Sequence, residues 1–465
     1  MQVVIIGAGP CGLTAAWELA QAGFGVTLIE RDSAVGGLCK TVRRNGYQFD
    51  MGGHRFISRN QELVDNVKRL MGERLMARQR RSAILFPGRR FKYPLDMGDI
   101  LRNGSLMENA GFALGYLAAA MGISRSSAPQ GSFQRWAETQ FGKPLYKVFF
   151  GPYTAKLWGV DPGTLSGQWA PGRISLLSAL DAVMKAAGLG GQTPRTYART
   201  YLYPMGGIGE IFETMAARVT SLGGRLLLGH EVESMVVQHG RVEAVAAKGP
   251  DGGHIEVEGD LFLSTAPLGA LTRMIDPKLD LPLPSRGLRF LNMILDDEEN
   301  LSEYTWQYTP SADVVMTRIQ EPKRRSPWSA PEGKTSVMLE IPCDPGGSLW
   351  RMEDTPLMEL ALEGMKKLGY RLEGKVAEVF STREPEAYPL MTLGCEQVRD
   401  AALGAAGALE NLATEGRQGR FGYIFMDQAM LAGRRWARRI INGDTGAPPP
   451  EDQPGVVHEA GSLAE

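Results

Sequence analysis

Continuous apolar runs and a helical pattern alternate over the first thirty residues of the chain. Residues 3–6 are uninterruptedly apolar, which is typical of a buried parallel strand. Residues 13–22 have helical spacing and good helix formers, and a second apolar run at 26–29 ends on Glu30. This strand–helix–strand order predicts one βαβ unit of a dinucleotide-binding fold.

Three glycines in a G-x-G-x-x-G pattern, Gly7, Gly9 and Gly12, separate the first strand from the helix. Gly7 allows a tight turn, Gly9 lets the backbone approach a pyrophosphate, and Gly12 lets the helix pack closely on the strand. The free N–H groups at the start of the helix attract phosphate. Glu30 stands 18 residues past Gly12, where a carboxylate can accept hydrogen bonds from ribose hydroxyls.

The remaining chain changes its pattern several times. An amphipathic helix is expected at 60–72, and residues 94–187 are mainly helix formers broken by Gly and Pro. A helix is expected at 210–222. Residues 288–384 contain apolar or alternating segments around one helix at 356–368, which predicts an antiparallel sheet with a covering helix.

Composition narrows the class of protein. A length of 465 residues is too great for one ordinary core and predicts two or three domains. The net charge of −1 provides no field that would attract nucleic acid. The four cysteines show neither C-x-x-C nor metal-ligand spacing, so we expect no metal site and a reducing, cytoplasmic environment. Met1 leads directly into the first strand, and we expect no signal peptide.

Two stretches leave alternatives open. Residues 110–123 carry no charge over 14 residues, which is too short to cross a bilayer. We expect a buried helix there, and the alternative is a membrane-surface or lipid-facing helix. Residues 78–92 are rich in arginine, either as a solvated hairpin or as a site of phosphate attraction.

Residues 30–37, ERDSAVGG, extend the dinucleotide motif. This run resembles the FAD-binding signature of glutathione-reductase-type flavoproteins of the amine-oxidase class. In that class an arginine and paired glycines, here Arg31, Gly36 and Gly37, approach the ribose and phosphates of the cofactor. The resemblance implies that the cofactor is FAD rather than NAD.

Further segments carry a more specific resemblance: MGGH at 51–54, YTAKLWG at 153–159, YPMGG at 203–207 and GRQGRFGYIFMDQAM at 416–430. With them the chain resembles the UDP-galactopyranose mutase and protoporphyrinogen-oxidase-like branch of the amine-oxidoreductase flavoproteins. The resemblance implies an α/β protein with a Rossmann-like FAD-binding domain, an inserted helical subdomain and an antiparallel-sheet substrate region. The expected division is 1–75, 200–287 and 385–442 for the discontinuous FAD domain, 76–199 for the helical insertion, 288–384 for the sheet region and 443–465 for a flexible tail.

The resemblance also implies roles for individual residues. Gly53 and His54 would lie against the flavin ring, and Val232 would cover the adenine. Arg417 would lie near the riboflavin phosphates, while Met426 and Asp427 would begin a helix that faces the pyrimidine end of the flavin. We expect His54, Arg173 and Tyr423 to act in catalysis, and Trp158, Arg173 and Arg318 to bind substrate.

These residues favour an FAD-dependent oxidoreductase that transfers hydride from a sugar-like or polyprenyl-linked metabolite to flavin N5. The alternative is a mutase like UDP-galactopyranose mutase, non-redox, in which reduced flavin forms a covalent sugar adduct. A mutase would need a dense diphosphate clamp, and only Arg173 is well placed for one, so we favour net redox chemistry. The expected partner is a small molecule, phosphorylated or lipid-linked. A flavin-binding protein without turnover is a third hypothesis.

Overall fold

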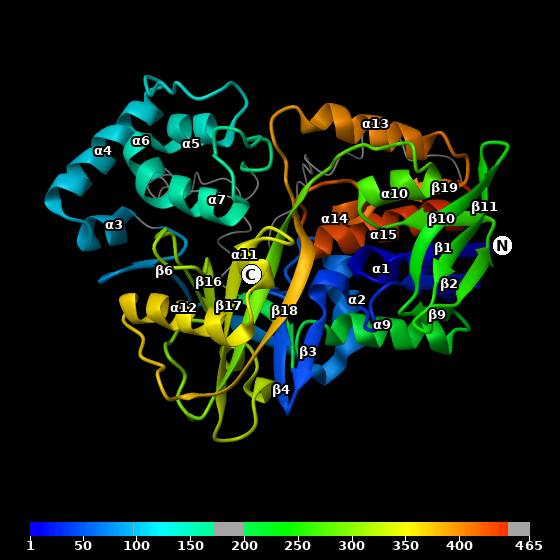
Figure 1. The fold of residues 1–465 in the computed structure, drawn as a ribbon, viewed down its shortest axis with the longest axis horizontal. Coiled ribbons are helices and arrows are strands. Elements are labelled where there is room, and N and C mark those ends of the chain that lie inside the picture. The colour runs from blue at the N-terminus through cyan, green and yellow to red at the C-terminus, as the bar shows by residue number, and fades with distance from the viewer. Residues whose placement is uncertain (96, 172–199, 445–465) are drawn as a thin grey trace.

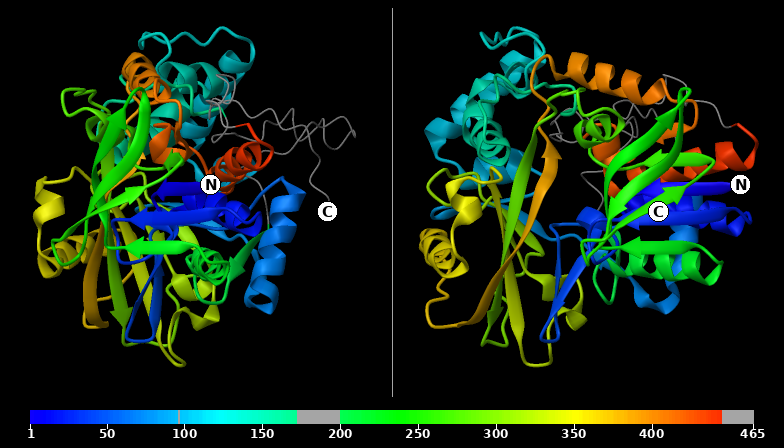
Figure 2. Two further views of the ribbon diagram at one scale, coloured as in Figure 1. Left: turned by 90° about the vertical axis from the view of Figure 1, so that its right-hand side faces the viewer. Right: turned by 45° about the vertical axis from the view of Figure 1, so that its right-hand side comes forward.

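The protein consists of an α/β body that carries the N-terminus and a second body built on a large sheet with a helical subdomain at one end (Figures 1 and 2). The computed structural model describes residues 1–95, 97–171 and 200–444. Residues of the expected tail from 445 onward, and Arg173, lie outside the described residues.

A parallel sheet forms the centre of the first body. α1 (Pro10–Gln21) connects its two neighbouring N-terminal strands, so the predicted strand–helix–strand order is present. The strands come from three separated stretches of the chain. In spatial order they are β19 (Leu412–Thr414), β13 (Leu261–Ser264), β1 (Gln2–Ile6), β2 (Gly25–Glu30) and β9 (Arg225–Leu228).

Both faces of this sheet are buried, because alternate residues of a strand point to opposite sides. Val3 and Ile5 pack with the helices α1, α9 and α15, whereas Val4 and Ile6 share a core with a three-stranded sheet and with α10 and α13. The covering elements are α2 (Gln61–Met71), α9 (Glu210–Ser221), α15 (Met426–Ile441), β10 (Glu231–Gln238), β11 (Arg241–Lys248), β12 (His254–Glu258), α10 (Leu268–Ile275) and α13 (Cys395–Gly407).

The second body is built on a seven-stranded sheet. Its central pairs are antiparallel, and α12 (Asp354–Lys367) packs against it, as the alternating segments predict. One pair, β15 with β6, is parallel. In spatial order the strands are β18 (Val376–Pro389), β14 (Ser285–Leu295), β17 (Thr335–Cys343), β16 (Arg318–Gln320), β15 (Trp306–Tyr308), β6 (Ser82–Phe86) and β7 (Arg89–Lys92).

The start of the expected helical insertion at residue 76 differs from the structure. Residues 75–92 form strands, and the hairpin of β6 and β7 extends the large sheet. The apolar stretch of β6 is buried there, and Gly88 with φ +71° makes the turn. The sequence indicated a hairpin as one interpretation of residues 78–92, but it could not show which sheet the hairpin joins. The remaining domain boundaries stay predictions.

Shorter elements complete the chain. Two pairs of strands lie outside the main sheets, and the helical subdomain follows β7. These elements are β3 (Thr41–Arg44), β4 (Tyr47–Asp50), β5 (Leu75–Gln79), β8 (Thr200–Pro204), α3 (Met97–Asn103), α4 (Leu106–Ala120), α5 (Phe133–Phe141), α6 (Lys143–Leu145), α7 (Gly151–Trp158), α11 (Ser348–Arg351) and α14 (Gly416–Gly419).

The expectation of a buried helix at 110–123 is wrong. The segment begins within α4, and of the helix's described residues only Phe112 is buried. α4 lies at the edge of the molecule and is covered on one side only (Figure 1). Among the described residues, no helix has both the length and the apolar character needed to cross a membrane.

Two helices cross at a glycine. A Cβ atom added at Gly433 of α15 would lie 2.1 Å from the carbonyl oxygen of Cys11 in α1. Nothing lies within 4 Å of a Cβ at Gly404, which is exposed on α13. Gly433 therefore permits the close contact between α1 and α15, whereas Gly404 is not needed for packing.

We expect Gly433→Ala to destabilise the protein by about 1–3 kcal/mol, because backbone atoms must move apart. Gly404→Ala should stabilise it by about 0.5–1 kcal/mol, since alanine is the better helix former. Chemical denaturation of both variants measures the free energy of unfolding. Equal stabilities of the two variants would contradict this account of the helix crossing.

Candidate functional site

A cavity of about 720 Å³ lies at the carboxyl ends of the parallel strands. Ile6, Glu30 and Thr265, at or just beyond the ends of β1, β2 and β13, line it. Residues from β14, β16, β17 and β18 of the large sheet complete the wall. The cavity therefore lies where the two bodies meet, at the end of a parallel sheet where ligands of this fold bind.

The glycine loop leaves open space at the start of α1. A Cβ at Gly9 would meet nothing within 4 Å, and no side chain caps the helix. Gly37, with φ +51°, comes close to the same point, because its added Cβ would lie 3.4 Å from the Cα of Gly9. By contrast, a Cβ at Gly12 would lie 2.0 Å from the carbonyl oxygen of Gly7. These positions form a cradle for a phosphate group at a helix N-terminus.

Glu30 is held by the backbone around this cradle. Its carboxylate accepts hydrogen bonds from the N–H of Ala8 (2.7 Å) and the N–H of Asp32 (2.9 Å). The side chain is buried and lines the cavity. Gly36 supports the same loop, since its N–H donates to the carbonyl oxygen of Ala8 at 2.8 Å.

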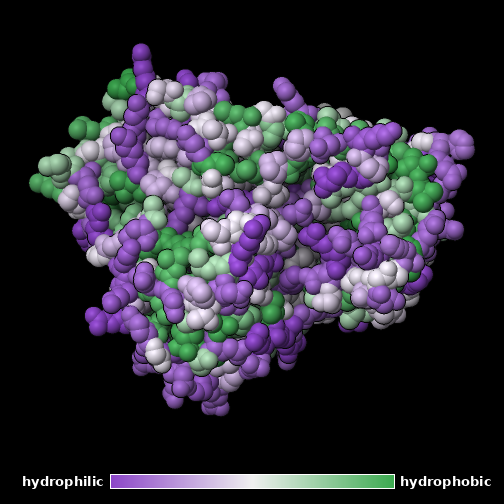
Figure 3. All heavy atoms as spheres, viewed as in Figure 1, coloured by the Kyte–Doolittle hydropathy of each residue, from purple (hydrophilic) through white to green (hydrophobic). Residues whose placement is uncertain are grey.

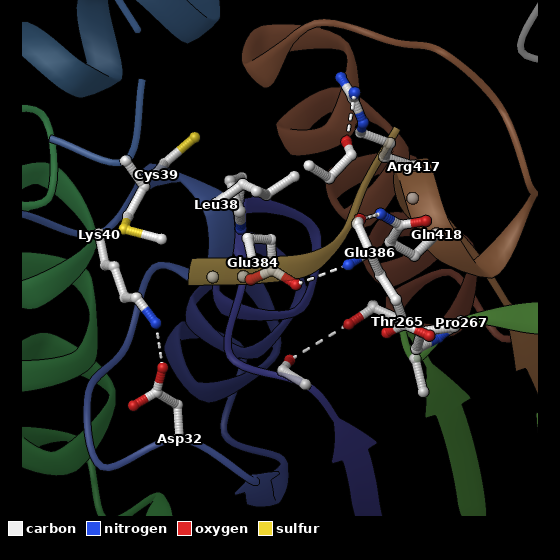
Figure 4. A pocket seen from close by; sticks show the side chains of 18 of the residues that line it. Asp32, Leu38, Cys39, Lys40, Thr265, Pro267, Glu384, Glu386, Arg417 and Gln418 are labelled. Atoms are coloured by element: carbon white, nitrogen blue, oxygen red, sulfur yellow. Dashed lines mark hydrogen bonds and ion pairs between the residues drawn. The ribbon is translucent and has the colours of Figure 1, made fainter. Parts of the chain in front are cut away.

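Acidic side chains surround the outer part of the cavity, and two basic residues pair with them. Arg31 lies 3.3 Å from Glu386 and 3.8 Å from Glu384. Figure 4 shows Lys40 and Asp32 facing each other on one side of the pocket and the two glutamates on the other. Val232, buried on β10, lines the cavity beside this group. Its role as the cover of the adenine stays a prediction.

A buried carboxylate holds the loop that carries His54. Asp50 accepts from the hydroxyl of Thr41 (2.7 Å) and the N–H of Ile208 (3.0 Å), and it lies 3.4 Å from the guanidinium of Arg325. Arg325 also donates to the carbonyl oxygen of Gly52 at 3.3 Å. The loop after β4 is thus tied to three other segments, and this fixes the position of the histidine.

His54 lines the cavity in its neutral form. Burial, helped by the guanidinium groups of Arg417, Arg318 and Arg325, lowers the pKa of the imidazole to about 3. Its Nδ1 atom is buried and has no hydrogen-bond partner among the described residues. The ring can therefore offer a hydrogen bond to a bound molecule without carrying charge.

A cation and two tyrosines form the next part of the wall. The Arg417 guanidinium lies 4.5 Å from the ring centre of Tyr423 and 5.2 Å from that of Tyr388. It also donates to the carbonyl oxygens of Ala387 (2.7 Å) and Ile424 (3.2 Å). The two tyrosine rings lie 5.6 Å apart at an angle of 63°. Burial raises the pKa of Tyr388, so its phenol stays neutral.

Arg318 lies in the cavity wall together with a buried acid. Its guanidinium is 2.6 Å from the carboxylate of Glu340, whose side chain is fully buried. A Cβ at Gly53 would lie 2.4 Å from Arg318 Nη1, so the glycine allows this close approach. The charge of the arginine is balanced inside the protein.

The YTAKLWG segment forms α7 and is fastened to the large sheet. Lys156 donates to the carbonyl oxygens of Thr309 (3.0 Å), Ser311 (2.9 Å) and Met316. Burial lowers the pKa of its amine to about 7. These bonds hold Tyr153 of the same helix with its ring centre 5.7 Å from that of a tyrosine on β15.

Three predicted site residues lie elsewhere than expected or cannot be placed. Trp158 does not line the cavity; it packs behind Tyr388 and Tyr423, with ring centres 5.6 Å from each. Met426 lines the cavity at the start of α15, whereas Asp427 is buried outside the lining. Arg173 falls outside the described residues and stays a prediction. The roles of all these residues remain proposals.

The sequence analysis missed several residues of the wall, among them Glu340 and Tyr388. Glu340 is the single charged residue of β17, in the mainly apolar part that follows Thr335 and Ser336, and a lone acid in such a strand was the available signal. Tyr388 was missed because it comes near the end of β18, beyond the apolar part of the strand. The strand continues to Pro389, with Glu384 and Glu386 lining the cavity, so its polar residues only resembled a loop.

The family model for flavin containing amine oxidoreductases matches residues 10–294, more than half of the chain. The chain belongs to this family. The resident cofactor of this flavin containing amine oxidoreductase is FAD, as predicted. The protein is a flavin-dependent enzyme, and its mixed α/β fold is that of the family.

Relatives within the family carry out different chemistry. Phytoene dehydrogenase from Streptomyces griseus is 26% identical over 425 residues, which cover 80% of each chain. Protoporphyrinogen oxidase 2 from Arabidopsis thaliana is 24% identical over 173 residues, 36% of this chain and 34% of that protein. The crystal structure of reduced UDP-galactopyranose mutase superposes with a TM-score of 0.80 over 95% of both chains at 21% identity. The expected similarity to a protoporphyrinogen oxidase and to a UDP-galactopyranose mutase is thus found, and the last relative shows the fold.

The cavity fits FAD by its own features. The open cradle at Gly9 accommodates a pyrophosphate, and Glu30 lies at the end of β2, where a carboxylate can accept from ribose hydroxyls. Among the described residues no three His, Cys, Asp or Glu side chains come together as ligands for a metal ion.

We expect Gly9→Val to yield a folded protein that is colourless, because the added side chain enters the cradle and not the core. The backbone at residue 9, with φ −78°, accepts any residue. Gly12→Ala is the matched control: it should lower the free energy of unfolding of flavin-free protein by about 1–3 kcal/mol. Flavin absorbance and chemical denaturation are the measurements, and full flavin content in Gly9→Val would contradict the cradle.

A second prediction concerns the pH dependence of stability. The folded pKa of His54, about 3, lies below its unfolded value of about 6.5, so unfolding takes up a proton between those values. Stability should therefore fall below about pH 6.5, by about 1.4 kcal/mol per pH unit for this group.

His54→Gln should remove that contribution. Urea denaturation of flavin-free protein at about pH 7.5 and about pH 5 should show a loss about 2 kcal/mol smaller in the variant than in the wild type. Identical pH profiles of the two proteins would show that the imidazole is not held neutral.

Proposed function

We propose that the protein is an FAD-dependent dehydrogenase that takes hydride from an uncharged part of a polyprenyl-linked or sugar-like metabolite. The family membership and the relation to a phytoene dehydrogenase along 80% of each chain support a redox reaction. The observation that carries the proposal is the buried ion pair of Arg318 with Glu340 in the cavity wall.

This pair matters because it cancels the charge of an arginine that a diphosphate-binding enzyme would need free. Glu340 is 0% exposed and Arg318 16%, so water screens the pair little. Separating the pair to bind an anion would leave a buried carboxylate uncompensated, at a cost of several kcal/mol. The wall beside the cofactor therefore suits a neutral group.

Tyrosine rings surround this neutral region. Tyr153, Tyr308, Tyr388 and Tyr423 stand at neighbouring positions, and Arg318 lies 5.6 Å from the ring centre of Tyr308. Burial raises the pKa of Tyr153 and of Tyr388, so both remain phenols at neutral pH. Rings with a hydroxyl can pack against an apolar chain or hydrogen-bond to a sugar.

FAD, when bound, accepts the hydride. The protein contributes orientation and electrostatics. We assign to His54 the positioning of the substrate or the cofactor through a hydrogen bond, because a pKa of about 3 makes the imidazole a poor proton acceptor. The guanidinium group of Arg417, which lies over the rings of Tyr388 and Tyr423, supplies positive potential that favours negative charge arriving with the hydride.

A flavin-dependent sugar mutase, without net redox change, is the second candidate. The same positive potential would favour binding of a negatively charged sugar nucleotide. This observation supports the mutase as the second candidate. Under it, Arg173 and Arg318 would contact the diphosphate, and Tyr423 the sugar. Glu340 argues against this use of Arg318.

An anaerobic mixing experiment distinguishes the dehydrogenase from the mutase. Oxidised enzyme is mixed with polyprenyl-phosphate sugars or with UDP-galactose. A dehydrogenase bleaches the visible flavin absorbance in proportion to product formed. Ring contraction of UDP-galactose by chemically reduced enzyme, with no electrons consumed, would reject the dehydrogenase.

The ion pair gives a matched test. We expect Glu340→Gln to free the arginine charge and to tighten binding of an anionic nucleotide sugar at least tenfold. Flavin fluorescence titration measures binding. Unchanged affinity in the variant would show that this pair does not set the charge preference of the site.

A further inference from the structure

α4 exposes a continuous apolar stripe. Leu106, Ala110, Leu114, Leu117 and Met121 follow one another at intervals of three or four residues, so they share one face of the helix. Leu106 is 90% exposed, Leu114 69% and Met121 65%. Figure 3 shows hydrophobic side chains gathered over α4 at the left edge of the molecule.

The opposite face of α4 is firmly held. Phe112 is buried with its ring 6.0 Å from that of Phe149, and a Cβ at Gly115 would lie 2.6 Å from Pro144. The helix begins at a capping box, in which Ser105 and Glu108 exchange hydrogen bonds. The stripe is therefore displayed by a well-anchored helix and is not a frayed end.

The charge around the stripe is positive. Residues 89–147 contain eight Lys and Arg but four Asp and Glu, in a chain whose net charge is −1. Asp99 and Glu138 are buried, and Glu108 is 2.8 Å from Arg89. Besides Arg89, which pairs with Glu108, the exposed basic side chains of this region are Arg90, Lys92, Arg102, Arg125, Lys143 and Lys147.

We infer that this surface, which we call the α4 surface (residues 106–123 with the six basic residues), docks on an anionic phospholipid bilayer. An exposed apolar stripe with cations around it matches the hydrocarbon boundary and the headgroups of such a membrane. A helix of 15 residues is about 22 Å long, shorter than the hydrocarbon core of about 30 Å, so α4 lies in the interface. A second copy of the chain fits less well, because pairing two such surfaces would bring like charges together.

The α4 surface belongs to the same subdomain as α7, which packs behind two tyrosines of the cavity wall. Tyr153 and Trp158 of α7 contact the tyrosines of the site, while α4 faces away from it. Docking would therefore place the wall of the site near the headgroups, where a lipid-linked molecule is available. The membrane contact itself does not depend on the identity of the substrate.

Vesicle flotation of the FAD-loaded protein tests the inference. The wild type should float with vesicles of phosphatidylcholine and phosphatidylglycerol and bind pure phosphatidylcholine at least tenfold more weakly. Leu114→Glu with Leu117→Glu should abolish flotation while flavin content and melting temperature stay unchanged. Leu222→Glu, at a leucine 49% exposed beside α9 in the other body, is the control and should float like the wild type.

The basic residues give a second measurement. Arg125→Ala and Lys143→Ala should each weaken binding about fivefold, and added salt should reduce binding further. Absence of wild-type flotation would overturn the inference. So would a concentration-dependent dimer, seen by light scattering, that the double leucine variant abolishes while vesicle binding stays absent.

Discussion

The close approach of backbone to backbone at the start of α1 is the constraint on which the rest of the structure depends. At Gly12 the helix touches the carbonyl oxygen of Gly7, and at Gly433 it touches α15. Only a residue without Cβ permits either contact. Together they hold the helix N-terminus at the end of the parallel sheet and leave the space at Gly9 open. The backbone is in close contact at Gly12 and at Gly433, and the space beside Gly9 stays open as part of the cavity.

Two buried acids, one in the cavity wall and one behind the loop that carries His54, are each paired with an arginine, and this affects what the site can hold. Asp50 is paired with Arg325, and Glu340 with Arg318. Because an unpaired buried charge costs several kcal/mol, each pair fixes the loop or strand that carries it. The positions of His54 and of Gly53 follow from these pairs. The neutral imidazole and the neutral phenols are therefore consequences of burial, and they set the polarity of the site.

The helical subdomain serves two surfaces at once. Its inner helix, α7, is tied to the large sheet by Lys156, and it supports the tyrosines of the site from behind with Trp158. Its outer helix, α4, packs through Phe112 and leaves its leucines exposed. None of the described residues of this subdomain lines the cavity that contains the cofactor cradle, so its outer helix can vary without disturbing the cradle.

The sequence by itself determined the elements whose signals are local. The spacing of Gly7, Gly9 and Gly12 between two apolar runs predicted the βαβ unit, because the backbone geometry of that turn needs those glycines at those intervals. The alternating segments after residue 288 predicted the second sheet, and the segments around residues 54, 156 and 426 identified the family.

Only the tertiary structure decided the features that depend on distant neighbours. Glu340 and Arg318 are paired because adjacent strands place them side by side, and Tyr388 meets Tyr423 because β18 runs on past its apolar part. Trp158 proved to be support and not lining. The hydrophobic composition of α4 could not show that the helix is covered on one face only. Burial depends on which other elements pack against the helix, and the residues of the helix do not specify those elements.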